Sequence, residues 1–198
     1  MRANLLFILI VLPSFVWGAD RDALKKPVEF FAEEITLSVD DSSATIEGVY
    51  RFRNRTSKQG EYPVVFPFHV DSASTYPDLI EAATLGPNAR PIQVRRNEDR
   101  GAAILRVPLM PDTITSWRLR YKQRISGRSA RYILTSTQAW GQPLDEATYC
   151  IIVPSKFEIV SVWPKQDSVA GRGDLVEYWA HKKNFMPDRD MQVTWVLK

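Results

Sequence analysis

Hydrophobic and polar residues alternate along most of the chain after residue 30, with the two-residue period of half-buried β-strands. The run 114–125 shows this most clearly, because one parity is apolar and the other carries Arg118, Arg120, Lys122 and Arg124. Residues 31–39 alternate too, although Glu33 interrupts their apolar parity. No segment has a convincing helical period of 3.6 residues. The pattern predicts an all-β fold, an antiparallel two-sheet sandwich of about a dozen strands.

Turn residues separate the predicted strands. Asp40-Asp41-Ser42 joins the run 31–39 to the run 44–52 as a hairpin. Pro63 and Pro67 share one parity of the strand 61–69, which predicts an edge strand or one that leaves its sheet near Pro67, because proline has no N–H to donate. The remaining predicted strands are 79–85, 92–96, 102–107, 114–125, 131–136, 147–153, 157–163, 175–180 and 191–197.

The N-terminus has the three-part order of a secretory signal peptide. Arg2 precedes an apolar run, and Gly18 follows where a signal peptidase would cut. The run 5–17 contains Pro13 and is shorter than the roughly 20 residues needed to span a bilayer. We therefore predict a signal peptide over 1–18, one domain over 19–198 with a candidate subdomain break at 126–128, no transmembrane segment in the mature chain, and a secreted or periplasmic location.

Composition narrows the function classes. The chain has 198 residues, 44% of them hydrophobic, as in ordinary globular domains. A formal net charge of +3 gives no support to nucleic-acid binding. The one cysteine, Cys150, lies in an apolar strand, so we predict a buried small side chain rather than a nucleophile.

The charge is unevenly distributed. Residues 113–144 hold six basic side chains and no acidic one. Arg118, Arg120, Lys122 and Arg124 would project from one strand face about 7 Å apart. We define these four residues as the basic stripe. It could bind an acidic envelope protein, an anionic glycan or a lipid surface, or it could be an ordinary solvated face.

Catalytic and metal-binding patterns are weak. His69 and Asp71 form a His-x-Asp pair that His181 could join, but two ligands do not make a zinc site. Adjacent acids such as Glu33 and Glu34 point to opposite faces of a strand. The sequence has no nucleophile-elbow, zinc-protease or phosphate-loop motif. We predict no catalytic residues, no bound metal and no cofactor.

Trp140 differs from the other mature-chain tryptophans, because it falls in a predicted loop over 137–144 and not in a strand. A loop tryptophan with polar neighbours can stack on a sugar ring or anchor a partner. The alternative is that Trp140 folds back to close one end of the sandwich. With the basic stripe, it is the best candidate for ligand or partner contact.

Two sets of short motifs resemble known families. The strand 34–39, the strand ending in Phe52-Arg53-Asn54, and Phe66-Pro67-Phe68 resemble the N-terminal β-sandwich domain of inter-alpha-trypsin-inhibitor-like proteins. The run 131–137, followed by Trp140-Gly141-Gln142-Pro143-Leu144, is similar to a pattern in uncharacterised secreted prokaryotic β-sandwich proteins. The resemblance implies an envelope sandwich and names no ligand.

These observations favour an extracytoplasmic, non-catalytic binding or interaction module. Two alternatives stay open from the sequence. One is a carbohydrate-active hydrolase, which would need two carboxylates facing one cleft. The other is a structural component of a cell-envelope complex.

Overall fold

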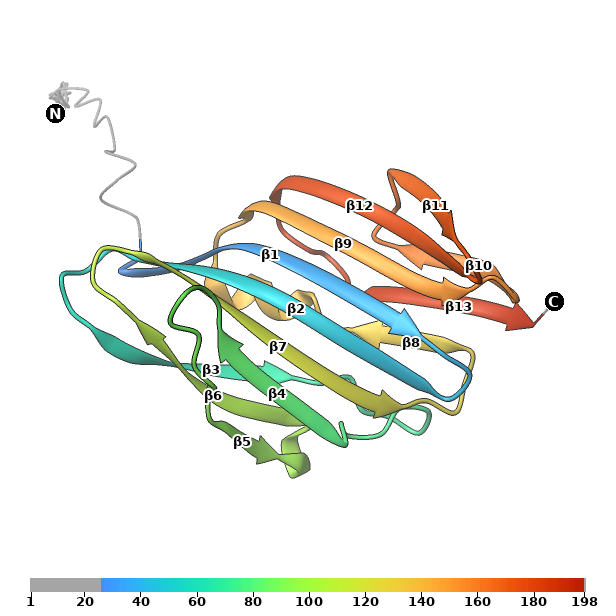
Figure 1. Cartoon of the computed structure of the whole chain (residues 1–198), viewed down its shortest axis with the longest axis horizontal. Helices are drawn as coiled ribbons and strands as arrows, with labels where there is room; N and C mark the ends of the chain where they lie inside the picture. The colour runs from blue at the N-terminus through green and yellow to red at the C-terminus, as the bar shows by residue number, and fades with distance from the viewer. Residues whose placement is uncertain (1–25, 198) are drawn as a thin grey trace, which may run out of the picture.

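The computed structural model describes residues 26–197, so the predicted signal peptide lies outside the described residues. Thirteen strands account for most of these residues, with two short 3-10 helices between them (Figure 1). The strands are β1 (Val28–Val39), β2 (Ser43–Asn54), β3 (Gly60–Pro67), β4 (Leu79–Thr84), β5 (Val94–Asn97), β6 (Ala102–Leu109), β7 (Ile114–Arg124), β8 (Ser129–Tyr132), β9 (Leu144–Pro154), β10 (Phe157–Trp163), β11 (Ser168–Arg172), β12 (Leu175–Phe185) and β13 (Met191–Leu197). The 3-10 helices are η2 (Glu98–Arg100) and η3 (Thr135–Trp140).

The all-β class is confirmed, but the structure has three sheets and not the two sheets of the predicted sandwich. A seven-stranded sheet has the order β11-β12-β9-β1-β2-β7-β4, and two three-stranded sheets have the orders β10-β13-β8 and β3-β6-β5. The strands are not all antiparallel either, because β1 runs parallel to β9. Parallel neighbours need a long connection, and here most of the chain separates the two strands.

The two small sheets cover one face of the large sheet (Figure 1). Side chains from all three sheets, such as Leu37, Leu105 and Val193, join one buried hydrophobic cluster. The inward parity predicted for β7 is confirmed, since Trp117, Leu119 and Tyr121 are fully buried. Residues 126–128 connect β7 to β8 between sheets, and residues on both sides of them belong to the same cluster.

Local chemistry explains where several elements begin and end. Asp40 caps the β1–β2 turn, because its carboxylate accepts hydrogen bonds from the backbone N–H groups of Ser42 and Ser43 at 2.9 and 2.8 Å. β3 is an edge strand that ends at Pro67, as its prolines predicted. β11 escaped prediction because all of its residues are exposed and no apolar parity marks it.

A β-bulge near the start of β1 changes which side chains face the core. Phe30 pairs with Phe52, but Ala32 pairs with Arg51, so the register shifts by one residue. Before the bulge, the side chain of Phe30 points into the core cluster. After the bulge, Glu33 and Ile35 point inward and Ala32 does not. The bulge therefore brings an aromatic ring and a carboxyl group to the same side of the sheet.

Cys150 is buried, as predicted. Burial, assisted by the charge of Glu177, raises the pKa of its thiol to about 12, so the thiol stays protonated at neutral pH. Within 26–197, no helix has the length and apolar character needed to cross a membrane.

Candidate functional site

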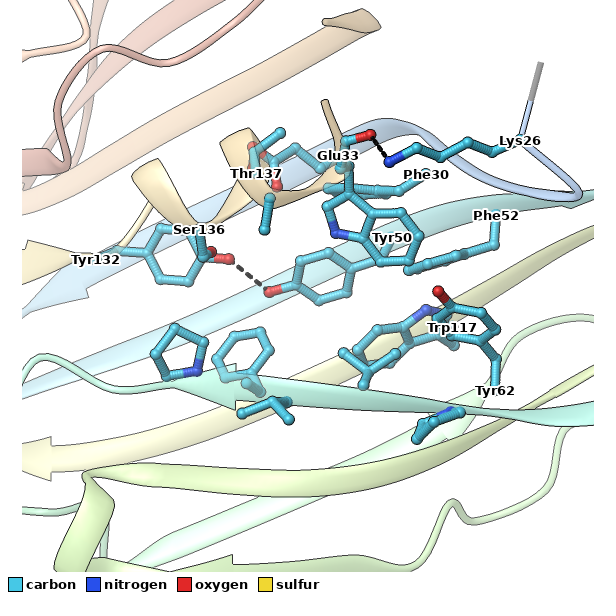
Figure 2. Close-up of a pocket in the computed structure, with 17 residues that line it drawn as sticks. Lys26, Phe30, Glu33, Tyr50, Phe52, Tyr62, Trp117, Tyr132, Ser136 and Thr137 are labelled. Atoms are coloured by element: carbon cyan, nitrogen blue, oxygen red, sulfur yellow. Dashed lines mark hydrogen bonds between the residues drawn. The ribbon is translucent and has the colours of Figure 1, made fainter. Parts of the chain in front are cut away.

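A cavity of ≈ 420 Å³ lies between the large sheet, β3 and η3 (Figure 2). This size falls in the usual range for small-molecule sites. β1, β2 and β7 supply one wall, β3 supplies the opposite wall, and the η3 segment closes one side. We call it the aromatic cavity, because its lining includes Phe30, Tyr50, Phe52, Tyr62, Phe66, Trp117, Tyr132 and Trp140.

Trp140 packs against rings from three strands. Its ring centroid lies 5.8 Å from that of Phe30, 5.1 Å from Phe52 and 5.6 Å from Tyr62. The contacts with Phe30 and Phe52 are edge-to-face, an arrangement that is favourable beyond the apolar area that it buries. Trp140 thus folds back onto the sheets and, half-buried, also forms part of the cavity wall.

The chain holds η3 in place from both ends. At its start, one oxygen of Asp190 accepts hydrogen bonds from the backbone N–H groups of Leu134 and Thr135, at 3.2 and 3.1 Å. At its end, Gly141 adopts a left-handed conformation with φ 68°, which favours glycine. The ammonium of Lys26 donates to the backbone carbonyl of Trp140 (Figure 2). The strand predicted over 131–136 is instead β8, which ends at Tyr132, and the backbone N–H groups of Leu134 and Thr135 bind Asp190 rather than a neighbouring strand.

Glu33 places a carboxyl group in this apolar lining. Glu33 is only 2% exposed, and the hydroxyl of Tyr149 donates a hydrogen bond of 2.7 Å to its Oε1. Burial raises the pKa of Glu33 to about 7, against the opposing effect of the Tyr149 hydrogen bond. Glu33 therefore changes its charge near neutral pH, unlike an exposed glutamate.

Two further polar groups of the lining belong to aromatic side chains. The hydroxyls of Tyr50 and Tyr132 form a hydrogen bond of 2.9 Å across the two layers (Figure 2). Burial raises the pKa of both tyrosines, so they remain protonated. The indole Nε1 of Trp117 is buried and has no hydrogen-bond partner among residues 26–197. An unpartnered buried donor is costly, and a ligand in the cavity could accept its hydrogen bond.

The structure does not bring the histidines together. His69 lies in the loop after β3, where its Nε2 is 3.1 Å from Asp71 Oδ2. His181 lies on β12 in a different sheet, and its Nδ1 is 3.2 Å from Thr148 Oγ1. No group of three or more His, Cys, Asp or Glu side chains in the described residues is arranged to hold a metal ion.

The basic stripe is exposed on the outer face of β7, away from the aromatic cavity. Acidic groups on other segments lie close to its cations: Arg118 is 3.9 Å from Glu47, Lys122 is 4.0 Å from Asp40, and Arg124 is 3.1 Å from Asp78. Arg120 pairs in register with Glu47 on β2 and Glu81 on β4. The local excess of positive charge in the sequence is thus largely compensated in space.

We expect the ion pairs of the basic stripe to contribute less to the free energy of unfolding than the ion pairs of the buried Glu29. Arg118→Ala and Lys122→Ala should each change the free energy of unfolding by less than about 1 kcal/mol, because both pairs are solvent-exposed and screened. Glu29→Ala should cost about 2 kcal/mol, because this buried carboxylate accepts charged hydrogen bonds from Arg53 and Arg55 at 2.8 and 2.7 Å. Urea denaturation measures all three, and equal losses would contradict this reasoning.

No family model matches the chain, and no curated protein matches it. Among solved structures, it is similar to a Legionella pneumophila protein described as a "putative nutrient binding protein". The TM-score is 0.65 with 13% sequence identity, and the match covers 85% of this chain and 67% of the other. At this identity the likeness shows a shared fold and assigns no ligand.

The aromatic cavity contains one predicted contact residue, Trp140, and omits the basic stripe and both histidines. Sequence reasoning missed Glu33 as a site residue, although its signal was present: a glutamate at an apolar parity. Tyr62 and Tyr132 were hidden, because their place in a cavity wall depends on how separate sheets meet.

Proposed function

We propose that this protein is an extracytoplasmic, non-catalytic binding protein that takes a small, largely apolar molecule into the aromatic cavity. The cavity carries the proposal, because its size, aromatic walls and few inward polar groups are the features of small-molecule sites. The predicted signal peptide supports the location, and the fold is compatible with that of a protein described as nutrient-binding.

The lining favours binding over glycoside hydrolysis. A glycosidase needs two carboxyl groups on opposite sides of the bond that it cleaves. Of the described residues that line the cavity, Glu33 alone carries a carboxyl group. A ligand could instead use Glu33 and the Trp117 indole N–H, which has no partner among residues 26–197, as fixed polar contacts within an apolar surface.

Binding of the uncharged dye N-phenyl-1-naphthylamine, followed by its fluorescence, tests the proposal. We expect Trp140→Ala to weaken binding by about tenfold, because the substitution removes one aromatic wall. Trp179→Ala is the matched control, since Trp179 alternates with the core residue Ala180 on β12, so its side chain lies on the opposite face of the large sheet, stacked on His181. A folded wild-type protein that fails to bind the dye, or equal affinity in the Trp140 variant, would count against the proposal.

A further inference from the structure

We propose that the ligand of the aromatic cavity carries a positively charged nitrogen, an amine or ammonium group, which Glu33 and the surrounding rings recognise together. This inference rests on the proposed function and names the chemical class of its ligand.

β1 carries two buried glutamates, Glu29 and Glu33, whose hydrogen-bond and ion-pair partners differ. Glu29 is 8% exposed and forms ion pairs with Arg53 and Arg55, which lower the pKa of its carboxyl group against the effect of burial. Glu33 is more deeply buried, and Tyr149 is its hydrogen-bond donor within the described chain. Among the described residues, no arginine, lysine or histidine forms an ion pair with Glu33, whereas Glu29 has two such partners.

A buried carboxylate without a cation is costly, and the fold has paired Glu29 four residues earlier on the same strand. A cationic ligand would supply the missing partner of Glu33. The ligand would lose its hydration on entering the cavity, and this loss would be offset by the charge of Glu33 and by the aromatic rings of the lining.

The rings provide the second half of the site. Aromatic faces carry negative electrostatic potential and attract cations, most strongly where water is excluded. Two stacked pairs, Tyr50 with Trp117 at 4.5 Å and Phe30 with Phe52 at 5.1 Å, belong to the same lining as Glu33. Phe30, Tyr50, Phe52 and Glu33 all line this one cavity (Figure 2).

The other titratable groups near the cavity do not replace this cation. Tyr50, Tyr132 and Tyr149 face Glu33 from β2, β8 and β9, and burial keeps all three protonated by raising the pKa of each hydroxyl. Lys26 lines the cavity, but its ammonium donates to the Trp140 carbonyl. Glu33 is thus the group in this lining whose charge changes near neutral pH.

Two pairs of probes, matched in shape but not in charge, test the inference: choline against 3,3-dimethylbutan-1-ol, and benzylamine against benzyl alcohol. Tryptophan fluorescence or NMR titration measures each dissociation constant at pH 6 and pH 8. We expect at least one cation to bind tenfold or more tightly than its uncharged partner at pH 8. Its affinity should rise nearly tenfold from pH 6 to pH 8, as the ionised fraction of Glu33 increases.

Glu33→Gln should abolish both the preference for the cation and its pH dependence, while binding of the alcohols persists. Glu34→Gln is the matched control, because Glu34 is the next residue of β1 and points to solvent. Equal affinities within both pairs at pH 8, or an unchanged preference in the Glu33 variant, would overturn the inference. An affinity for the alcohols that falls as pH rises would identify protonated Glu33 as a donor to a neutral ligand instead, and would also overturn it.

The dye experiment separates the two proposals. If N-phenyl-1-naphthylamine binds in a manner that depends on Trp140 but neither cation is preferred, the cavity binds neutral molecules and only the cationic class is wrong. If neither the dye nor any probe binds the folded protein, the proposed function itself fails.

Discussion

Glu33→Gln is expected to gain stability relative to the wild type as the pH rises, by about 2.5 kcal/mol between pH 5 and pH 8. The folded protein holds the Glu33 proton more tightly than the unfolded chain does, because burial raises the pKa of this carboxyl group from 4.5 to about 7. The wild type therefore loses stability from above pH 4.5, and the loss levels off once the pH exceeds the folded-state pKa. Each pKa unit corresponds to about 1.4 kcal/mol.

Glutamine keeps an oxygen that can accept the Tyr149 hydrogen bond and removes the ionisation. Urea denaturation of the wild type and the variant at several pH values gives the difference in unfolding free energy, in which groups common to both proteins cancel. Glu34→Gln serves as the control, with an expected difference that stays nearly flat over this range. A flat difference for the Glu33 variant would show that Glu33 is ionised at low cost in the folded protein.

Gly48→Ala is expected to destabilise the protein by about 3 kcal/mol. Gly48 lies on β2, and the Tyr50 ring of the same strand face covers it. A Cβ atom at position 48 would lie 2.1 Å from the Tyr50 hydroxyl oxygen and 2.4 Å from its ring Cζ, far inside van der Waals contact. Trp117 and Phe66 pack against the Tyr50 ring, so the ring has little room to move.

Thermal and urea unfolding measure this loss, and Gly171→Ala is the matched control. Gly171 also lies in a strand, but nothing is within 4 Å of the position of an added Cβ atom. The displaced Tyr50 ring should also break its hydrogen bond to Tyr132 and weaken dye binding in the aromatic cavity. In a double-mutant cycle, Gly48→Ala should destabilise the Tyr50→Leu variant much less than it destabilises the wild type, because the obstructing ring is gone. If the two substitutions lower the free energy of unfolding additively, the Tyr50 ring is not the obstacle.

Much of the fold could be predicted because alternation is a local property. β10 and β13 have the predicted bounds, and the side chains of β7 point inward and outward as their parity indicates. Cys150 is buried because its strand is apolar on both faces at that point. These outcomes need only the two-residue period of a strand and the preference of apolar side chains for the core.

The candidate site was less predictable, because its residues meet through long-range contacts. Glu33 and Tyr149 are 116 residues apart, and Tyr50 and Tyr132 are 82 apart. Trp140 was a candidate for its loop position, but its role as a cavity wall depends on the hydrogen bonds that Asp190 makes at the start of η3.

By itself, the sequence determined the all-β class, most strand positions and the two faces of β7, because side-chain direction in a strand follows from parity. Only the tertiary structure decided that β1 lies parallel to β9, that a bulge turns Phe30 to the same side of the sheet as Glu33, and that acidic side chains lie beside the basic stripe. Hydrogen-bond registers between distant segments set these features, and a local period carries no information about which strands become neighbours.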